Sequence, residues 1–253
     1  MISGSANLVI ITVHSGPIIF LKKTLQSIDT QTVAPHHNIV VAKGISVYHT
    51  KYLQNNNRTF VINKDKSIYS AMNIALQNKI IKNKYIIFLN SGDSFFNKRI
   101  IFDIKKFFLT NNVLVGKQVL RIDNDTYYVR KYFYKKKKYS PHGSFLCHAN
   151  ILSCPTQKIL FDEKHIVDAD GLWMSKVVAK NKQRFKKINI NISTLSLGGV
   201  STNPTIKTIL HYFELNLNLF IKETIKFIMN TFLAKKIYYR VIYCLKYKYF
   251  KIK

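Results

Sequence analysis

Short runs of β-branched and apolar residues alternate with helical patterns in the first part of the chain, and this alternation limits the possible folds most strongly. The runs predict buried strands at Asn7–Val13, Asn38–Val41, Arg58–Asn63 and Tyr85–Leu89. The helical spacing of apolar residues between them predicts helices at Ile18–Ile28 and Tyr69–Lys82. Such alternation is typical of a parallel sheet built from right-handed crossovers, which binds ligands at the carboxyl ends of its strands.

The rest of the chain has a looser pattern that divides at Pro204. Before this proline, we expect helices at Ile100–Thr110 and Leu172–Asn181 and strands within Asn112–Tyr134, Phe145–Ser153 and Asn189–Leu197. Residues 1–204 are therefore expected to form one α/β domain, and residues 205–253 a helical extension.

The extension is strongly basic, as is the whole chain. The sequence has 40 Lys and Arg against 12 Asp and Glu, a formal net charge of +28, so we expect anionic partners: phosphate-bearing substrates, nucleic acid or an acidic membrane surface. A bias towards Lys, Asn and Ile can also account for part of the excess. In residues 205–253 lysines alternate with aromatic residues, a pattern typical of an interfacial amphipathic helix. A helical pair packed on the main domain, with solvated lysines, is the alternative.

The location of the protein is expected to be cytoplasmic. The 3 cysteines, Cys147, Cys154 and Cys244, show no paired spacing, which fits a reducing compartment and argues against a zinc site. We find neither a signal-peptide pattern nor an apolar segment long enough to span a membrane.

Asp93 is one of the few acidic residues, and it follows the strand predicted at Tyr85–Leu89 through Asn90-Ser91-Gly92. One carboxylate at the mouth of a parallel sheet suits Mg²⁺ or Mn²⁺, because these cations take their other ligands from water and phosphate oxygens. An aspartate that closes a surface turn is the other interpretation of the tetrapeptide alone.

The longer stretch DKSIYSAMNIALQNKIIKNKYIIFLNSGDSFF (Asp65–Phe96) resembles the family 2 glycosyltransferases. These are inverting nucleotide-sugar enzymes of the GT-A fold, and the likeness is closest to bacterial surface-polysaccharide members. The matching residues, in order and spacing, are Asp65, Lys66, Ile68, Tyr69, Ala71, Met72, Asn73 and Leu89–Asp93. Similar segments at Ile10–Gln31, His142–Phe145, Phe161–Asp170 and Leu197–Ser201 extend the resemblance over roughly residues 6–203.

The resemblance implies a Rossmann-like, mostly parallel GT-A sheet flanked by helices, with Asp93 as the ligand of Mg²⁺ or Mn²⁺. It also implies that Asp170, with Asp168 as the fallback, is the general base that deprotonates the acceptor hydroxyl. N-capping of the following helix is the other interpretation of these two aspartates. Donor binding is expected at Asp65, Lys66, Asn73, Asn90, Lys43 and His142. For His142 two interpretations stay open: a residue that shapes the acceptor or diphosphate pocket, and a core histidine bonded to the backbone.

The donor side departs from the family pattern. Ala42 replaces the Asp that contacts the nucleotide base, while Lys43 stands at a Gly position, where it can meet a phosphate. Other departures are Ser67, Ser70, Gly143 and the loop His14-Ser15-Gly16. Either the donor is unusual or the enzyme is weakened, so an inactive transferase that serves as a scaffold is one alternative.

We therefore expect an inverting, metal-dependent transferase that moves a sugar, in the first instance from a UDP-sugar, to a hydroxyl of a growing, lipid-linked surface glycan such as capsule or lipopolysaccharide. Its expected place is peripheral, on the inner face of a bacterial inner membrane. The rival is a basic nucleic-acid-binding protein, suggested by the net charge of +28. No recognisable nucleic-acid-binding motif supports this rival.

Overall fold

The computed structural model describes residues 6–63, 67–108, 113–121, 127–130, 142–152, 158–165, 169–196, 209 and 217–232. The strands are β1 (Ala6–His14), β2 (Pro35–Ala42), β3 (Arg58–Ile62), β4 (Tyr85–Phe88), β5 (Ser94–Phe95), β6 (Val113–Arg121), β7 (Tyr127–Arg130), β8 (Phe145–His148) and β9 (Phe185–Leu195). The α-helices are α1 (Ile18–Asp29), α2 (Val47–Tyr52), α3 (Ile68–Leu76), α4 (Ile100–Lys105), α5 (Ala169–Lys180) and α7 (Leu217–Phe232).

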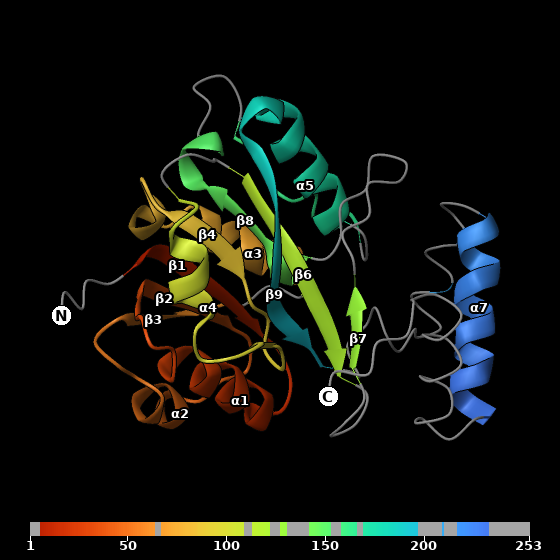
Figure 1. Cartoon of the computed structure of the whole chain (residues 1–253). Coiled ribbons are helices and arrows are strands. Elements are labelled where there is room, and N and C mark those ends of the chain that lie inside the picture. The colour runs from red at the N-terminus through yellow and green to blue at the C-terminus, as the bar shows by residue number, and fades with distance from the viewer. Residues whose placement is uncertain are drawn as a thin grey trace.

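One twisted sheet with strand order β3-β2-β1-β4-β8-β6-β9-β5 forms the centre of the molecule (Figure 1). The first part, β3-β2-β1-β4, is parallel, as the alternation of strands and helices predicts. The second part is mixed, because β8 runs antiparallel to β4 and β6, whereas β6 and β9 are parallel. Strand β7 pairs with the end of β6.

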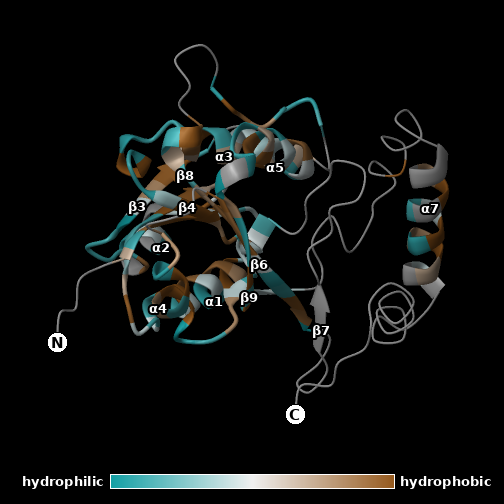
Figure 2. Cartoon of the chain, turned by 45° about the horizontal axis from the view of Figure 1, so that its top comes forward, coloured by the Kyte–Doolittle hydropathy of each residue, from teal (hydrophilic) through white to brown (hydrophobic). Residues whose placement is uncertain are grey.

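Helices cover both faces of the sheet in a three-layer arrangement (Figure 2). Because neighbouring residues of a strand point to opposite faces, β1 contributes to both layers. Val9 and Ile11 pack in the core with α3 and α5, and Leu8 and Ile10 pack in the core with α1 and α4. Both faces of the sheet are therefore apolar, and ligands can reach it mainly at its edges and strand ends.

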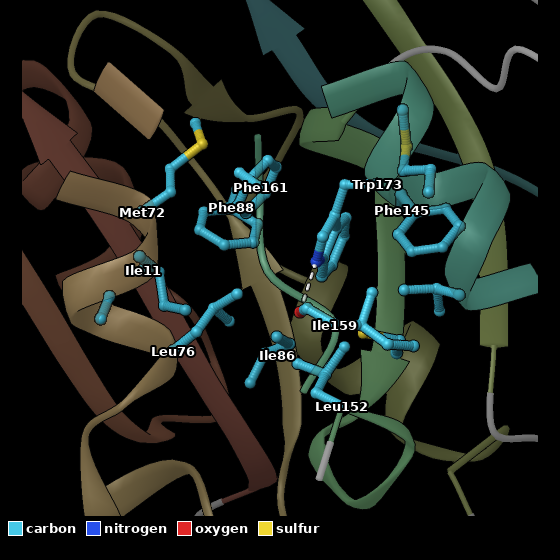
Figure 3. Close-up of a cluster of buried hydrophobic side chains, with 14 of the residues drawn as sticks. Ile11, Met72, Leu76, Ile86, Phe88, Phe145, Leu152, Ile159, Phe161 and Trp173 are labelled. Atoms are coloured by element: carbon cyan, nitrogen blue, oxygen red, sulfur yellow. Dashed lines mark hydrogen bonds between the residues drawn. The ribbon is translucent and has the colours of Figure 1, made fainter. Parts of the chain in front are cut away.

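The core on the α5 side is centred on Trp173 (Figure 3). Its ring is stacked on Phe161 with centroids 4.7 Å apart, and it meets Phe88 and Phe145 edge-on. Its indole N–H donates to the Ile159 carbonyl at 3.2 Å. Since Trp173 is only 2% exposed, it fixes α5, and with it the start of that helix, against the sheet.

The expected elements are present, with differences at their ends. The helix expected over residues 69–82 is divided into α3 and a 3₁₀ turn at Lys79–Ile81, because the Asn78 side chain accepts from the Ile80 N–H and caps the turn. The strand expected over residues 145–153 ends at His148, where a 3₁₀ turn follows. Strand β9 begins before residue 189, and helix α2 was not expected.

Helix α7 lies to one side of the three layers (Figure 1). It falls within the extension expected to be helical, most of which, including its Lys-rich end, is outside the described residues. Among the helices of the described part, none is both long and apolar enough to cross a membrane.

Candidate active site

The carboxyl ends of four neighbouring parallel strands meet at one edge of the sheet. The backbone hydrogen bonds between the strands continue there into the loops. The Lys43 N–H donates to the His14 carbonyl at 3.0 Å. The Asn63 N–H donates to the Ala42 carbonyl at 2.8 Å. The Ser91 N–H donates to the Val13 carbonyl at 3.0 Å. These bonds bring the loops after β1, β2, β3 and β4 together, where ligands bind in open α/β sheets.

Residues Asn90 to Asp93 form a tight turn at this edge. The Asp93 N–H donates to the Asn90 carbonyl at 2.9 Å, and Gly92 has a φ of 99°. This combination matches a type II turn, whose third residue needs a positive φ and is therefore usually glycine. Asp93 thus closes a turn, as the other interpretation expected, but it is buried and does not lie at the surface.

Helix α1 holds the turn through Thr24, a residue that the sequence did not single out. The Thr24 hydroxyl accepts from the Gly92 N–H at 2.9 Å and donates to the Asp93 carbonyl at 2.6 Å. Thr24 is fully buried on the apolar face of α1. A polar residue on that face was the only signal of this contact in the sequence.

Asp93 is 5% exposed as a residue, and its carboxylate lies in basic surroundings. Its Oδ1 accepts from the Ser196 N–H at 3.0 Å, and the Ser196 hydroxyl accepts from the Lys23 ammonium at 2.9 Å. Partial burial and the charge of Arg121 lower the pKa of Lys23, whereas the charge of Asp93 raises it. Cationic side chains beside a fixed carboxylate are suited to an anionic ligand such as a diphosphate.

Asp93 does not belong to a ready-made metal cage. Across the described residues, no group of three or more His, Cys, Asp and Glu could hold a metal ion. One carboxylate nevertheless fits Mg²⁺ or Mn²⁺ bound together with a nucleotide, because such ions are commonly held by one or two carboxylates, water and phosphate oxygens.

A chain of hydrogen bonds joins the turn to the start of α5. The Asn90 side-chain nitrogen lies 3.1 Å from His142 Nε2, and His142 Nδ1 lies 2.9 Å from Asp170 Oδ2. The side chains of His142 and Asp170 are 23% and 28% exposed, so solvent or a substrate can reach them. The structure thus brings together three predicted site residues that are far apart in the sequence.

Asp170 is the second residue of α5. Its Oδ1 accepts from the Gly171 N–H at 2.9 Å, and a helix N-terminus stabilises a negative charge. Because Asp170 lies inside the first turn, it is not the residue that precedes the helix and caps it. Its alternative, Asp168, lies outside the described residues, as do Asp65 and Lys66.

The other predicted donor-side residues have different surroundings. Lys43 is exposed directly after β2, at the carboxyl edge of the sheet. Asn73 is buried, and its amide donates to the Phe161 carbonyl at 3.0 Å and to Glu163 at 2.8 Å. It therefore ties α3 to the segment that precedes Asp170.

Two departures from the family pattern have local structural reasons. Ser67 is the N-cap of α3, since its hydroxyl accepts from the Tyr69 N–H at 3.2 Å. A Cβ at Gly143 would lie 2.7 Å from Gln118 Nε2, so a larger residue there needs a shift of neighbouring side chains.

His14 replaces part of the family's usual loop and is buried at the end of β1. Its Nδ1 lies 2.8 Å from the Ser91 hydroxyl, and burial lowers its pKa. We therefore expect a neutral imidazole that supports the turn, beside the buried Ala42 at the end of the neighbouring strand.

Comparison with solved structures defines the class of fold. S. aureus TarS in complex with UDP-GlcNAc matches with a TM-score of 0.60 and 14% identity over 93% of this chain and 70% of that chain. TarS with UDP matches with a TM-score of 0.58. The mannosyltransferase PcManGT from Pyrobaculum calidifontis, with GDP-Man and Mn²⁺, matches with a TM-score of 0.55 and 10% identity over 79% of this chain and 59% of that chain.

The chain has the GT-A fold of nucleotide-sugar glycosyltransferases. No protein-family model and no curated protein matches its sequence. At such low identities the structural likeness concerns the fold, and the activity has to be argued from the site.

Proposed function

We propose that this chain is an inverting family 2 glycosyltransferase that moves a sugar from a nucleotide-diphosphate sugar, with UDP as the expected nucleotide, to an acceptor hydroxyl. One observation carries the proposal: hydrogen bonds through Asn90 and His142 connect the Asp93 turn to Asp170. This connection lies at the carboxyl ends of the strands of a GT-A sheet. The complexes of TarS with UDP-GlcNAc and of PcManGT with GDP-Man agree with it.

On the donor side, Asp93 and its basic neighbours bind the diphosphate. The Asp93 carboxylate would hold Mg²⁺ or Mn²⁺, and such an ion would supply positive charge against the leaving diphosphate. Lys23 adds positive charge near the same place. The Thr24 and Ser196 hydrogen bonds keep the turn and the carboxylate in one position, as electrostatic stabilisation of a transition state requires.

On the acceptor side, Asp170 is the general base. Its carboxylate removes the proton from the acceptor hydroxyl while that oxygen attacks the anomeric carbon from the face opposite the leaving nucleotide. This geometry inverts the configuration at that carbon. The position of Asp170 at a helix N-terminus favours the ionised carboxylate that a base requires.

A panel of nucleotide-sugars tests the proposal. With Mn²⁺ or Mg²⁺ and an acceptor extract, we expect release of the nucleotide diphosphate from one donor, in the first instance a UDP-sugar, and loss of release after chelation. Asp93→Ala is expected to reduce kcat by about 10²–10³-fold, the cost of removing one fixed electrostatic contact in a transition state. Asp103→Ala on α4, away from this edge, is the matched control.

Other outcomes distinguish the alternatives. Full activity of the Asp93→Ala variant would contradict the assigned role of Asp93. Nucleotide-sugar binding without turnover of any donor would favour the inactive scaffold. Steep salt-dependent binding of DNA or RNA, with no nucleotide-sugar binding, would favour the nucleic-acid-binding protein.

We further propose a lipid-linked glycan acceptor and contact with an anionic membrane surface, through residues 205–253, on the inner face of the bacterial inner membrane. Helix α7 supports this proposal because it exposes apolar side chains and buries charged ones, the reverse of a surface helix of a protein in water. Ile221, Ile225 and Ile228 share one face and are 47%, 50% and 49% exposed, whereas Glu223 and Lys226 are buried and paired at 2.5 Å. The basic sequence around this face complements anionic lipid.

Replacing these three isoleucines by glutamine is expected to weaken binding to phosphatidylglycerol vesicles by at least ~10-fold. Burial of an isoleucine side chain contributes about 1.5–3 kcal/mol, and each of the three is about half exposed before docking. Co-flotation with vesicles measures the effect, and Phe102→Gln, an equally exposed apolar position on α4, is the control. Unchanged binding of the triple variant, or equal binding of the wild type to phosphatidylcholine vesicles, would refute this surface.

A further inference from the structure

We propose that His142, held by Asn90, is a positioning residue that orients the Asp170 carboxylate for proton abstraction. The inference rests on the proposed function, because it takes Asp170 as the base. It also gives His142 a more specific role than shaping the acceptor or diphosphate pocket, and a different one from that of a backbone-bonded core histidine. The contacts of His142 at its two ring nitrogens are to side chains on either side of the candidate site.

The proton positions follow from the chemistry of the two neighbours. A carboxylate is only an acceptor, so the 2.9 Å contact with Asp170 Oδ2 requires a proton on His142 Nδ1. An amide nitrogen is only a donor, so the 3.1 Å contact with Asn90 requires a lone pair on His142 Nε2. Together the two contacts specify a neutral imidazole in its Nδ1–H tautomer.

The same contacts exclude His142 as the base in this arrangement. The lone pair on its Nε2 is directed at the Asn90 amide rather than at an acceptor hydroxyl. The proton therefore goes to Asp170, whose side chain is 28% exposed, and His142 acts through the carboxylate without accepting that proton.

His142 and the helix backbone together fix the plane of the carboxylate. Oδ2 accepts from His142 Nδ1, and Oδ1 accepts from the Gly171 N–H at 2.9 Å. Two donors on different oxygens prevent rotation about the Cβ–Cγ bond, which would otherwise turn the basic lone pairs away from the acceptor. Catalysis is sensitive to such rotation, because small misplacements of a catalytic group cost large factors in rate.

The orientation of the Asn90 amide and the protonation state of the His142 ring are coupled. Its side-chain oxygen is buried and has no hydrogen-bond partner among the described residues. If the amide turned over, that oxygen would face Nε2 and require a second proton on the ring, which would make His142 a cation. Because Asn90 also begins the turn that ends at Asp93, the residue that contacts His142 Nε2 belongs to the donor-side loop.

A measurement that needs no activity tests the tautomer. In ¹⁵N-histidine-labelled protein in mildly alkaline buffer, two-bond nitrogen–proton correlations should show one ring with a proton on Nδ1 and none on Nε2. Those signals should disappear in His142→Asn. A doubly protonated ring, or a neutral ring with its proton on Nε2, would overturn the proposal whether or not a donor has been identified.

Two variants of His142 separate positioning from general stability. The amide nitrogen of asparagine reaches roughly the place of Nδ1, whereas that of glutamine reaches the place of Nε2. We therefore expect His142→Gln to lower kcat by about 100-fold and His142→Asn to retain most of it, with the Kd for the nucleotide unchanged in both. His37→Asn is the matched control, since His37 also bonds through its ring, to the Thr59 hydroxyl at 2.8 Å, near the opposite end of β2.

The results of these experiments distinguish a failure of the positioning role from a failure of the proposed function. If the wild type turns over no donor, the proposed function fails, and the tautomer measurement alone decides the arrangement of His142. If the wild type is active, and both His142 variants match His37→Asn in kcat, the proposed function stands and the positioning role is wrong. A fall in kcat that follows a loss of thermal stability in both variants would show that His142 has a structural role, and it would also refute the positioning role.

Discussion

Asp170→Asn is expected to lower kcat for sugar transfer by about 10²–10⁴-fold, the range that a positioned general base contributes. The substitution keeps the size of the side chain but removes the basic lone pair that takes the acceptor proton. The amide oxygen can still accept from His142 Nδ1 or from the Gly171 N–H, so the local structure is expected to survive. The Kd for the nucleotide should remain near the wild-type value, because Asp170 acts on the acceptor.

Steady-state release of the nucleotide diphosphate and equilibrium binding of the nucleotide measure the two effects separately. Asp103→Asn, in the first turn of α4, is the matched control, since it makes the same chemical change at the start of another helix. Activity of Asp170→Asn within a few-fold of this control would rule out Asp170 as the base. The fallback Asp168 would then be tested by the same substitution.

Local sequence information was sufficient for the parallel half of the sheet and for the turn at Asp93. The runs that became β1, β2 and β4 are apolar because both faces of the sheet are covered there, and this requirement is visible in the sequence. Gly92 with its positive φ and Asp93 directly after β4 follow from the same local pattern. The position of Asp170 came from the family resemblance, not from periodicity.

Contacts between distant segments could not be predicted in this way. The hydrogen bonds of Thr24 to the turn, of Ser196 to Asp93 and of His142 to Asp170 join residues that no sequence spacing relates. They depend on the order of strands in the second half of the sheet, where β6 lies between β8 and β9. That order mixes parallel and antiparallel pairs, and the hydrophobic pattern of a buried strand is the same in both.

Trp173→Ala is expected to reduce the free energy of unfolding by about 3–5 kcal/mol, the usual cost of deleting a large buried aromatic side chain. The loss is expected to be large here because the indole is 2% exposed and contacts three aromatic rings, those of Phe88, Phe145 and Phe161. Trp173 lies three residues after Asp170 on α5. A cavity at Trp173 should therefore also loosen the base, and kcat should fall in the fraction of protein that stays folded.

Denaturant unfolding measures the stability, and Trp173→Phe separates the two contributions of the side chain. Phenylalanine keeps an aromatic ring in the core but removes the indole donor of the Ile159 carbonyl, the hydrogen bond drawn in Figure 3, so we expect a smaller loss, of about 1–3 kcal/mol. Phe102→Ala is the exposed control, for which a change within about 0.5 kcal/mol is typical. If Trp173→Ala were as stable as Phe102→Ala, the aromatic cluster would not be what anchors α5. The link from core packing through α5 to the position of Asp170 would then have to be abandoned.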